Sequence, residues 1–493
     1  MPPAILRCLP LALLAAAALW LRTHDLDQRP MHADEANQGV KTGELVEAGR
    51  YAFDPRDHHG PTLYYLGAAA AGIRGQTTLA ALDETTLRLV PALAGALAVP
   101  LLVLLARRRE PGGAGLSGPA ALAAGAFLAL APPAVYYSRY FIQETLLATA
   151  TLAVAFALRC WWHSGLTRWA VAAGAGVGFM QATKASTPLF LAAAAIALLL
   201  CRGAARPASP RLRRDLLAGL GAAAVTAALL YSSFGTHWAG LRDALSVYLH
   251  ALLRFGAEAP PTGHEKPWNY YLYLLGWSRS GGLLWHQAAL SAFALAGLAV
   301  ATRQRDAWLR GVAVYGLLIL AAFSAFPYKT PWHAVHFAAP AALLAGLALD
   351  ALARRRAGPI LAAAAALLVA FSLWQQTRLT SFLRPADGRN PWAYVHSSRD
   401  ILKFRPLVEA ARTARPGEPI RVISEEYWPL PWYFRGLPDV GYWTEAPADC
   451  DGALVIASIA QAEAVRARLR RPARESFVGL RPGFLCVVFS PEP

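Results

Sequence analysis

The feature that most constrains this chain is a run of about twenty apolar residues that recurs along most of its length. Such runs alternate with short arginine-rich clusters between residues 4 and 376. An apolar helix of about 20 residues is long enough to cross the hydrocarbon core of a bilayer. The repetition predicts an all-α membrane protein that crosses the bilayer many times, in agreement with a composition that is 56% hydrophobic.

The runs define eleven candidate spans. The first ends in bulky leucine and tryptophan, a poor site for signal peptidase, so we expect a retained helix instead of a cleaved signal peptide. The fifth and sixth spans are short and could form a tight hairpin. The spans are 4–23, 87–106, 116–137, 140–159, 169–183, 185–201, 215–233, 282–301, 308–326, 332–350 and 358–376.

The connections between the spans differ in charge on alternate sides. One set carries arginine clusters, such as 107–109 and 354–356, with few acids. Cytoplasmic loops of membrane proteins carry an excess of lysine and arginine, so this set and the N-terminus are predicted to be cytoplasmic. The acid-rich segment 24–86 then faces outward. The same rule accounts for the net charge of +16, and we expect no nucleic-acid partner.

Residues 385–493 differ in character from the transmembrane part, 1–384. The runs IRVIS, LPWYFRG, ALVIAS and FLCVVFS alternate with helical stretches near 398–413 and 459–470. This alternation predicts a small α/β domain, and the span count places it outside the cell membrane. Cys450 and Cys486 could form a disulfide there, although two unrelated thiols are the favoured interpretation.

Unusual polar residues collect on the predicted outer face. HADEA places Asp34 and Glu35 side by side just after the first span, and SRYFIQE brings Arg139 and Glu144 into an apolar context. An acid within a spanning helix is costly and usually faces a polar cavity, which makes Glu144 a site candidate. The alternative is a structural pair between Glu144 and an arginine.

Lysine is rare in this arginine-rich chain and occurs at only five positions. Lys184, Lys266 and Lys329 lie at predicted outer ends of spans. Lysine is a compact point charge suited to a phosphate. Alternatively, each could extend to the lipid headgroups.

Carboxylates and cations on one face suit the transfer of a sugar from a lipid-linked phosphate. A carboxylate can act as the base for the acceptor hydroxyl. The leaving phosphate needs stabilisation of its charge by lysine, arginine or a divalent cation. We therefore expect that Mg²⁺, Mn²⁺ or Zn²⁺ could bind the acids, with Asp34 and Glu144 as the candidate ligands.

Five motifs resemble those of GT-C membrane glycosyltransferases: HADEA, DPRDHHGPTLYYL, SRYFIQE, HEKPWNYY and YKTPWHAVHFAAP. The pattern is similar to that of the dolichyl-phosphate-mannose protein mannosyltransferases and the lipid A aminoarabinose transferase. It most resembles the related flippase-activity-associated family.

The resemblance implies roles for individual residues. Asp34 would be the base or a metal-associated acid with Glu35 beside it, and Glu144 would match a second acid after the third span. HGP resembles an element near the donor phosphate, which would make His59 a phosphate contact. Lys329 resembles a cation near the lipid phosphate.

We therefore expect an inverting glycosyltransferase of the plasma (inner) membrane that uses a polyprenyl-phosphate-linked hexose or pentose at the outer face. The base would be Asp34. The phosphate would be held by Lys329 with Lys266 or Arg139, and Lys184 and His59 are further candidates. The alternative is a non-catalytic protein of lipid-linked sugar export. A solute transporter is disfavoured because the acids gather at one face instead of the midplane. The sugar, the acceptor and the role of 385–493 stay open.

Overall fold

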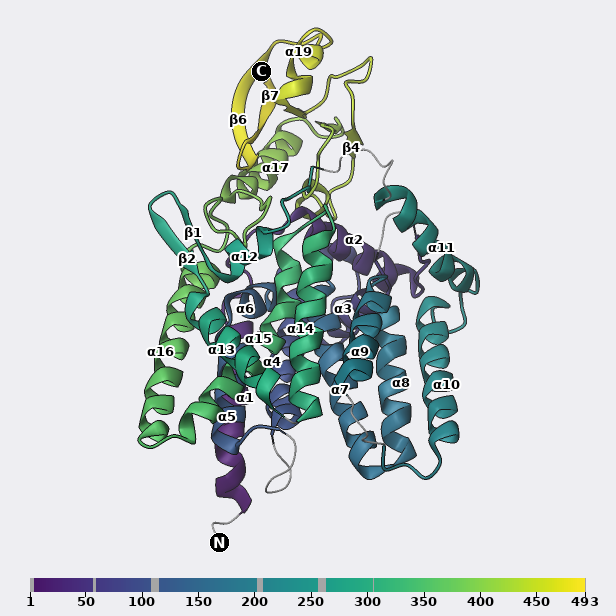
Figure 1. Ribbon diagram of the computed structural model, residues 1–493. Helices are drawn as coiled ribbons and strands as arrows, with labels where there is room; N and C mark the ends of the chain where they lie inside the picture. The colour runs from purple at the N-terminus through teal and green to yellow at the C-terminus, as the bar shows by residue number, and fades with distance from the viewer. Residues whose placement is uncertain are drawn as a thin grey trace. The chain divides into compact units, whose positions relative to one another are not determined.

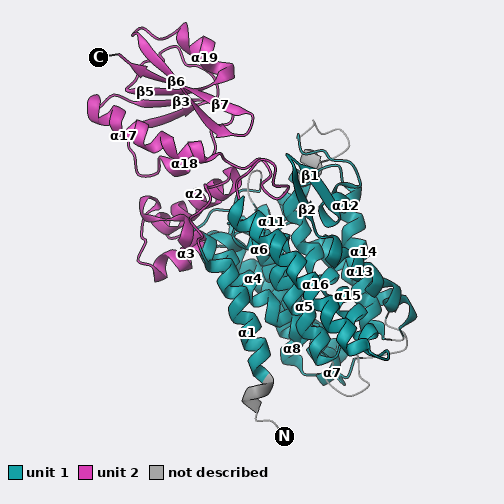
Figure 2. Ribbon diagram, turned by 90° about the vertical axis from the view of Figure 1, so that its left-hand side faces the viewer, with its two compact units in different colours: residues 1–24, 50–66, 88–384 teal, residues 25–49, 67–87, 385–493 magenta. Residues whose placement is uncertain are grey.

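The computed structural model describes residues 4–55, 59–107, 115–201, 207–255, 263–304 and 306–492. Residues 56, 57, 58, 108 and 109 of the segments discussed above lie outside these ranges. The chain divides into two compact units, shown in different colours in Figure 2. Unit 1 comprises 1–24, 50–66 and 88–384, and unit 2 comprises 25–49, 67–87 and 385–493. Unit 2 thus joins the predicted C-terminal domain to two pieces of the acidic segment 24–86.

Unit 1 is a helical bundle (Figure 1), and each of the eleven predicted runs contains a helix. The third run is a pair, α5 and α6, bent by 55° where Pro132 and Pro133 start a new helix. Proline lacks the N–H that the preceding helix would need, so the break follows from the sequence. The helices are α1 (Ala4–Thr23), α4 (Glu84–Ala106), α5 (Gly118–Leu130), α6 (Pro132–Ser138), α7 (Glu144–Ser164), α8 (Thr167–Gln181), α9 (Thr187–Cys201), α10 (Leu212–Tyr231), α13 (Ala288–Arg303), α14 (Ala307–Ala325), α15 (Val335–Ala353) and α16 (Gly358–Arg378).

Six helices of the described residues are long and apolar enough to cross a membrane, or seven if α5 and α6 count as one span. Four further apolar helices are shorter: Cys8–Thr23, Thr62–Ile73, Thr187–Cys201 and Ala288–Arg303. The chain is therefore a multi-pass membrane protein, and the count of eleven spans stays a prediction.

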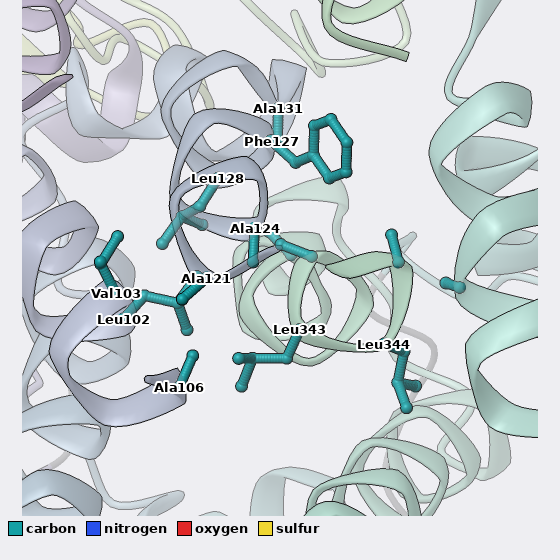
Figure 3. Packing of buried hydrophobic residues seen from close by; sticks show 14 of the residues in the cluster. Leu102, Val103, Ala106, Ala121, Ala124, Phe127, Leu128, Ala131, Leu343 and Leu344 are labelled. Carbon is teal, nitrogen blue, oxygen red and sulfur yellow. The ribbon is translucent and has the colours of Figure 1, made fainter. Parts of the chain in front are cut away.

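Small residues let the central helices of unit 1 pack closely. Ala106, Ala121 and Ala124 lie between leucines of α4, α5 and α15 (Figure 3). An apolar stretch of Pro331–Ala353, the segment that contains α15, is 78% buried, the largest share among the six helices that are long enough to cross a membrane. Short side chains allow backbones to approach in a membrane, where van der Waals packing replaces hydrophobic collapse.

One predicted span begins too early. Residues 277–286, part of which we assigned to the span 282–301, form a hairpin of β1 (Trp277–Ser280) and β2 (Leu283–His286), and α13 starts only at Ala288. The turn consists of Gly281 and Gly282, both with positive φ, as two-residue hairpin turns require. Two short helices, α11 (Ala239–Phe255) and α12 (Tyr270–Leu275), were also not predicted.

Unit 2 contains a five-stranded sheet in the order β4-β3-β5-β7-β6, so the prediction of a small C-terminal α/β fold is confirmed. Strand β3 pairs in parallel with β4 and β5, whereas β7 is antiparallel to β5 and β6. The strands are β3 (Ile420–Ile423), β4 (Val440–Trp443), β5 (Leu454–Ser458), β6 (Ala473–Arg481) and β7 (Phe484–Pro491). The described helices include α2 (Ala33–Ala48), α17 (Phe404–Ala414), α18 (Leu430–Tyr433) and α19 (Ile459–Arg466), while α3 (Thr62–Ile73) is shared between the units.

The run LPWYFRG forms the short helix α18 instead of a strand. The side chain of Trp432 is fully buried, and its Nε1 donates a hydrogen bond of 2.7 Å to Glu84 Oε1. Its ring also lies against Gly39 of α2, where a Cβ would come within 2.7 Å. These long-range contacts override the local preference of aromatic residues for strands. Cys450 and Cys486 are separate buried thiols.

Candidate active site

Two of the predicted site residues meet in unit 1 as a buried ion pair. Glu144 is the first residue of α7, and Lys184 lies in the turn between α8 and α9. Lys184 Nζ donates a hydrogen bond directly to Glu144 Oε1, and the two side chains are only 11% and 3% exposed. Glu144 is thus paired with a lysine instead of the arginine considered above.

The HGP segment packs against the turn that carries Lys184. The Thr62 N–H donates to Ala182 O at 3.2 Å, and Thr62 Oγ1 donates to Thr183 Oγ1 at 2.9 Å. A Cβ on Gly60 would lie 2.1 Å from Ala182 O, so only glycine allows this approach. His59 precedes this contact and is exposed.

Lys329 is buried in a connection between α14 and α15. Its Nζ donates to Lys266 O at 3.0 Å and to Phe326 O, and backbone hydrogen bonds tie the segment 264–266 to 327–329. No carboxylate among the described residues pairs with it, and burial lowers the pKa of its ammonium. An ammonium has three donors, so one is available to a ligand.

Aromatic and histidine side chains pack around the segment 330–336, which follows Lys329. Tyr271 Oη donates to Thr330 O at 3.1 Å and lies 3.1 Å from His333 Nδ1. His333 is within electrostatic range of Lys184 and His59. The His336 ring lies 4.6 Å from the Phe190 ring between centroids and is tilted to it by 57°. The sequence did not single out His333 and His336 as site residues. The signal that could have found them is the pair of histidines three residues apart at the start of an apolar helix.

Arg139 hydrogen-bonds to the backbone at the end of α1. Its Nη1 donates to Leu21 O at 3.3 Å and to His24 O, and its guanidinium lies 4.6 Å from the centre of the Phe382 ring. These carbonyls belong to the C-terminal end of α1, where a positive charge is favourable. The structure therefore gives Arg139 a role in holding α1.

A cavity of about 1010 Å³ runs between the helices of unit 1. Its lining includes Thr145, next to Glu144, and extends along α7 as far as His163. Eighteen residues of α-helix correspond to a length of about 27 Å, which approaches the thickness of a bilayer's hydrocarbon core. Alanine, leucine and valine of α7, α9, α14 and α15 are the largest group of its apolar lining residues.

The acidic pair lies in unit 2, at the N-terminus of α2. His32 is the N-cap and accepts a hydrogen bond from the Asp34 N–H at 3.0 Å. Glu35 Oε2 accepts from the His32 N–H at 3.2 Å, and its Oε1 lies 3.6 Å from Arg29 Nη2. This reciprocal capping box satisfies donors that would otherwise be orphaned.

The two acids are therefore not equivalent. Glu35 is completely buried in its capping contacts, whereas the Asp34 side chain is 49% exposed. His32 lies 3.8 Å from Asp34 Oδ2, and its ring meets the His396 ring edge-on at 5.8 Å. Burial lowers the pKa of both histidines. Of the two acids, Asp34 is the accessible one.

A metal site needs several converging ligands. Among the described residues, no three His, Cys, Asp or Glu side chains lie together in this way. The Glu144 carboxylate is already neutralised by Lys184. The metal therefore stays a prediction from the sequence.

The chain is similar to one protein-family model and to several solved structures. Residues 58–232 match the family model of dolichyl-phosphate-mannose-protein mannosyltransferases. No curated protein matches the sequence significantly. Among solved structures, the chain is similar to ArnT from Cupriavidus metallidurans bound to undecaprenyl phosphate, at 17% identity over 97% of both chains, with a TM-score of 0.67.

A second similar structure is the oligosaccharyltransferase AglB from Archaeoglobus fulgidus, in complex with an inhibitory peptide and a dolichol-phosphate. The identity is 15%, the match covers 94% of this chain and 71% of that chain, and the TM-score is 0.55. At such identities the likeness shows a shared fold. The family match over 58–232 and the shared fold agree with the resemblance to GT-C membrane glycosyltransferases described above.

Proposed function

We propose that this protein is a membrane glycosyltransferase that takes a sugar from a polyprenyl-phosphate donor. The observation that carries the proposal is the long apolar cavity whose lining includes Thr145, the residue after Glu144 of the buried Glu144–Lys184 pair. A cavity about 27 Å long suits an isoprenoid chain. The similar ArnT structure is bound to undecaprenyl phosphate, which supports the same class of lipid here.

The phosphate would lie at the polar end of the cavity. Lys184 carries its charge in a buried setting because Glu144 compensates it. Lys329 adds a cation that no described carboxylate neutralises. A fixed positive charge in a dry site stabilises the charge that develops on a leaving phosphate.

Asp34 would act as the general base. The acceptor hydroxyl attacks the anomeric carbon while Asp34 takes its proton, and the bond from that carbon to the phosphate oxygen breaks. The electron pair leaves on the polyprenyl phosphate, whose charge the lysines stabilise. One displacement inverts the anomeric carbon and needs a single carboxylate at the acceptor, which agrees with the capping role of Glu35.

We further propose that the reaction takes place at the outer face of the inner membrane, where the charge rule places 24–86. The sequence-based idea of a divalent metal at Asp34 and Glu144 also remains open to experiment. Full transfer after exhaustive chelation would oppose it, and recovery on adding back Mg²⁺, Mn²⁺ or Zn²⁺ would support it.

A second candidate is a lipid-linked sugar translocator in glycan export. The observation that favours it is that the cavity also reaches polar residues at its other end, including Arg159, Asp306 and Arg354. A translocator would bind and move the lipid without forming a glycosidic bond.

One experiment separates the two candidates. Asp34→Asn should abolish transfer from a polyprenyl-phosphate sugar in membranes while the protein still binds polyprenyl phosphate. Glu44→Gln, on the exposed side of the same helix, is the matched control and should keep normal transfer. Normal transfer by Asp34→Asn at normal expression would refute the catalytic role, and lipid export without any transfer would favour the translocator.

A further inference from the structure

The sheet of unit 2 has an edge at which three parallel strands end together. From β3 the chain passes to β4 on one side, and from β4 it crosses to β5 on the other side of β3. The connections that leave β3 and β5 therefore run in opposite directions. In open α/β sheets, ligands bind outside the carboxyl ends of the strands at such a switch point.

A hydrogen-bond network joins the three strand ends. Glu425 follows β3, and its carboxylate accepts from Ser458 Oγ at 3.0 Å and from Gln461 Nε2 at 2.5 Å. Gln461 Oε1 in turn accepts from the Ala446 N–H, in the segment after β4, at 3.2 Å. The loops after β4 and β3 are thus tied to the start of α19, which holds their side chains in place.

The carboxylate of Glu425 can still accept hydrogen bonds. A carboxylate offers about four lone-pair sites, and two are used by Ser458 and Gln461. The residue is exposed. The hydrogen bond from Gln461 is the main cause that lowers the pKa of Glu425, so the group is ionised at neutral pH.

Aromatic residues follow this carboxylate closely along the chain. Tyr427, two residues after Glu425, pairs with Tyr442 of β4 at 5.1 Å between ring centroids and an angle of 42°. Trp428 lies 6.2 Å from Tyr427, and all three aromatic side chains are half-buried, with part of each accessible. Two residues of chain span at most about 7 Å, so the backbone of Tyr427 lies within that distance of the backbone of Glu425.

We propose that this edge of unit 2 binds a saccharide that carries no acidic group. Sugar hydroxyls can donate to Glu425, while the apolar faces of a pyranose ring pack on Tyr427 and Tyr442. The exposed acid Glu445 disfavours phosphates and uronic acids, whereas Glu426 is paired with Arg481. The site lies within unit 2 alone and does not depend on the transfer reaction proposed above.

The test is saccharide binding by the full-length protein in detergent, without lipid donor. Ligand-observed NMR with neutral trisaccharides of mannose, glucose and galactose should show binding of at least one probe at about 10 mM. Tyr442→Ala and Glu425→Gln should each weaken that binding by about tenfold. A glucuronic acid trisaccharide should show no binding.

Two control variants match these substitutions elsewhere in the same unit. Phe477→Ala removes a ring that is 61% exposed on β6, and Glu463→Gln neutralises an exposed acid of α19; both should bind normally. If Tyr442→Ala fails to fold, the near-isosteric Glu425→Gln and the loop variant Tyr427→Ser still test the site. The proposal is overturned if no neutral probe binds, or if these variants bind as tightly as the unchanged protein.

Discussion

At the scale of single residues, the buried pair of Lys184 and Glu144 makes a sharp prediction. Lys184→Met leaves the carboxylate buried without its partner, which should destabilise the protein by about 3–5 kcal/mol. The double variant Lys184→Met with Glu144→Gln should regain most of this stability, because no buried charge remains. Thermal unfolding in detergent measures both effects.

The exposed pair of Lys41 and Glu44 is the control for that experiment. Their side chains are 30% and 54% exposed, so Lys41→Met should cost less than about 1 kcal/mol. A double variant of the buried pair that is as unstable as Lys184→Met would show that packing, instead of charge compensation, dominates there.

The buried histidines of unit 2 predict a dependence of stability on pH. Burial lowers the pKa of His396 well below 6.5, Arg29 and His32 lower it further, and Glu35 raises it. Below pH 6.5 the unfolded chain therefore binds a proton that the folded chain does not. As the pH falls below 6.5, the free energy of unfolding should decrease by up to about 1.4 kcal/mol per pH unit because of this histidine.

The measurement is thermal unfolding of the protein between pH 7.5 and about 5. His396→Gln should flatten the acid limb of the curve, whereas His24→Gln, at an exposed position, should leave it unchanged. An equally steep acid limb in His396→Gln would refute the assignment to this histidine.

At the scale of elements, glycines set the distance between α8 and α10. Gly174 and Gly178 form a GxxxG pattern, and a Cβ on Gly174 would lie 1.9 Å from Gly219 O. Such small-residue patterns let two membrane helices approach closely. Gly174→Val should therefore separate the helices and lower the unfolding temperature by several degrees.

Gly221 of α10 is the matched site for this comparison, because a Cβ there would meet nothing within 4 Å. Gly221→Val should change the unfolding temperature little. Equal effects of the two substitutions would mean that helix propensity, and not the contact between α8 and α10, determines the result.

At the scale of the whole molecule, the cavity of unit 1 predicts a selectivity for lipid length. Ala339 lines the cavity on α15, and Ala339→Trp should obstruct it. Transfer from a long polyprenyl donor should then show a raised KM, at least about tenfold, whereas a donor with a two-isoprene chain should be affected less.

The control substitution is Ala364→Trp, on an exposed position of α16. It adds the same bulk outside the cavity and should leave both donors unaffected. A uniform loss of activity with every donor in Ala339→Trp would point to a distorted fold instead of an obstructed lipid site.

The sequence by itself determined the helical runs, because a spanning segment must bury about twenty apolar residues and satisfy its own backbone hydrogen bonds. It also predicted the β-branched strands β3, β5 and β7. It did not determine the hairpin 277–286, which depends on the turn at Gly281 and Gly282. It also did not determine the helix at LPWYFRG, which depends on contacts of Trp432 with the distant residues Glu84 and Gly39.

For the candidate site, the sequence identified unusual residue types, and only the tertiary structure decided their tasks. Glu144 and Lys184 are 40 residues apart, and they pair because α7 and α8 run in opposite directions. Glu35 is held in the capping box of α2, and Arg139 donates to the C-terminal end of α1. Of these three residues, Asp34 is the accessible one. Charge pattern and hydropathy act locally along the chain, whereas a pairing of side chains depends on which segments the fold brings together.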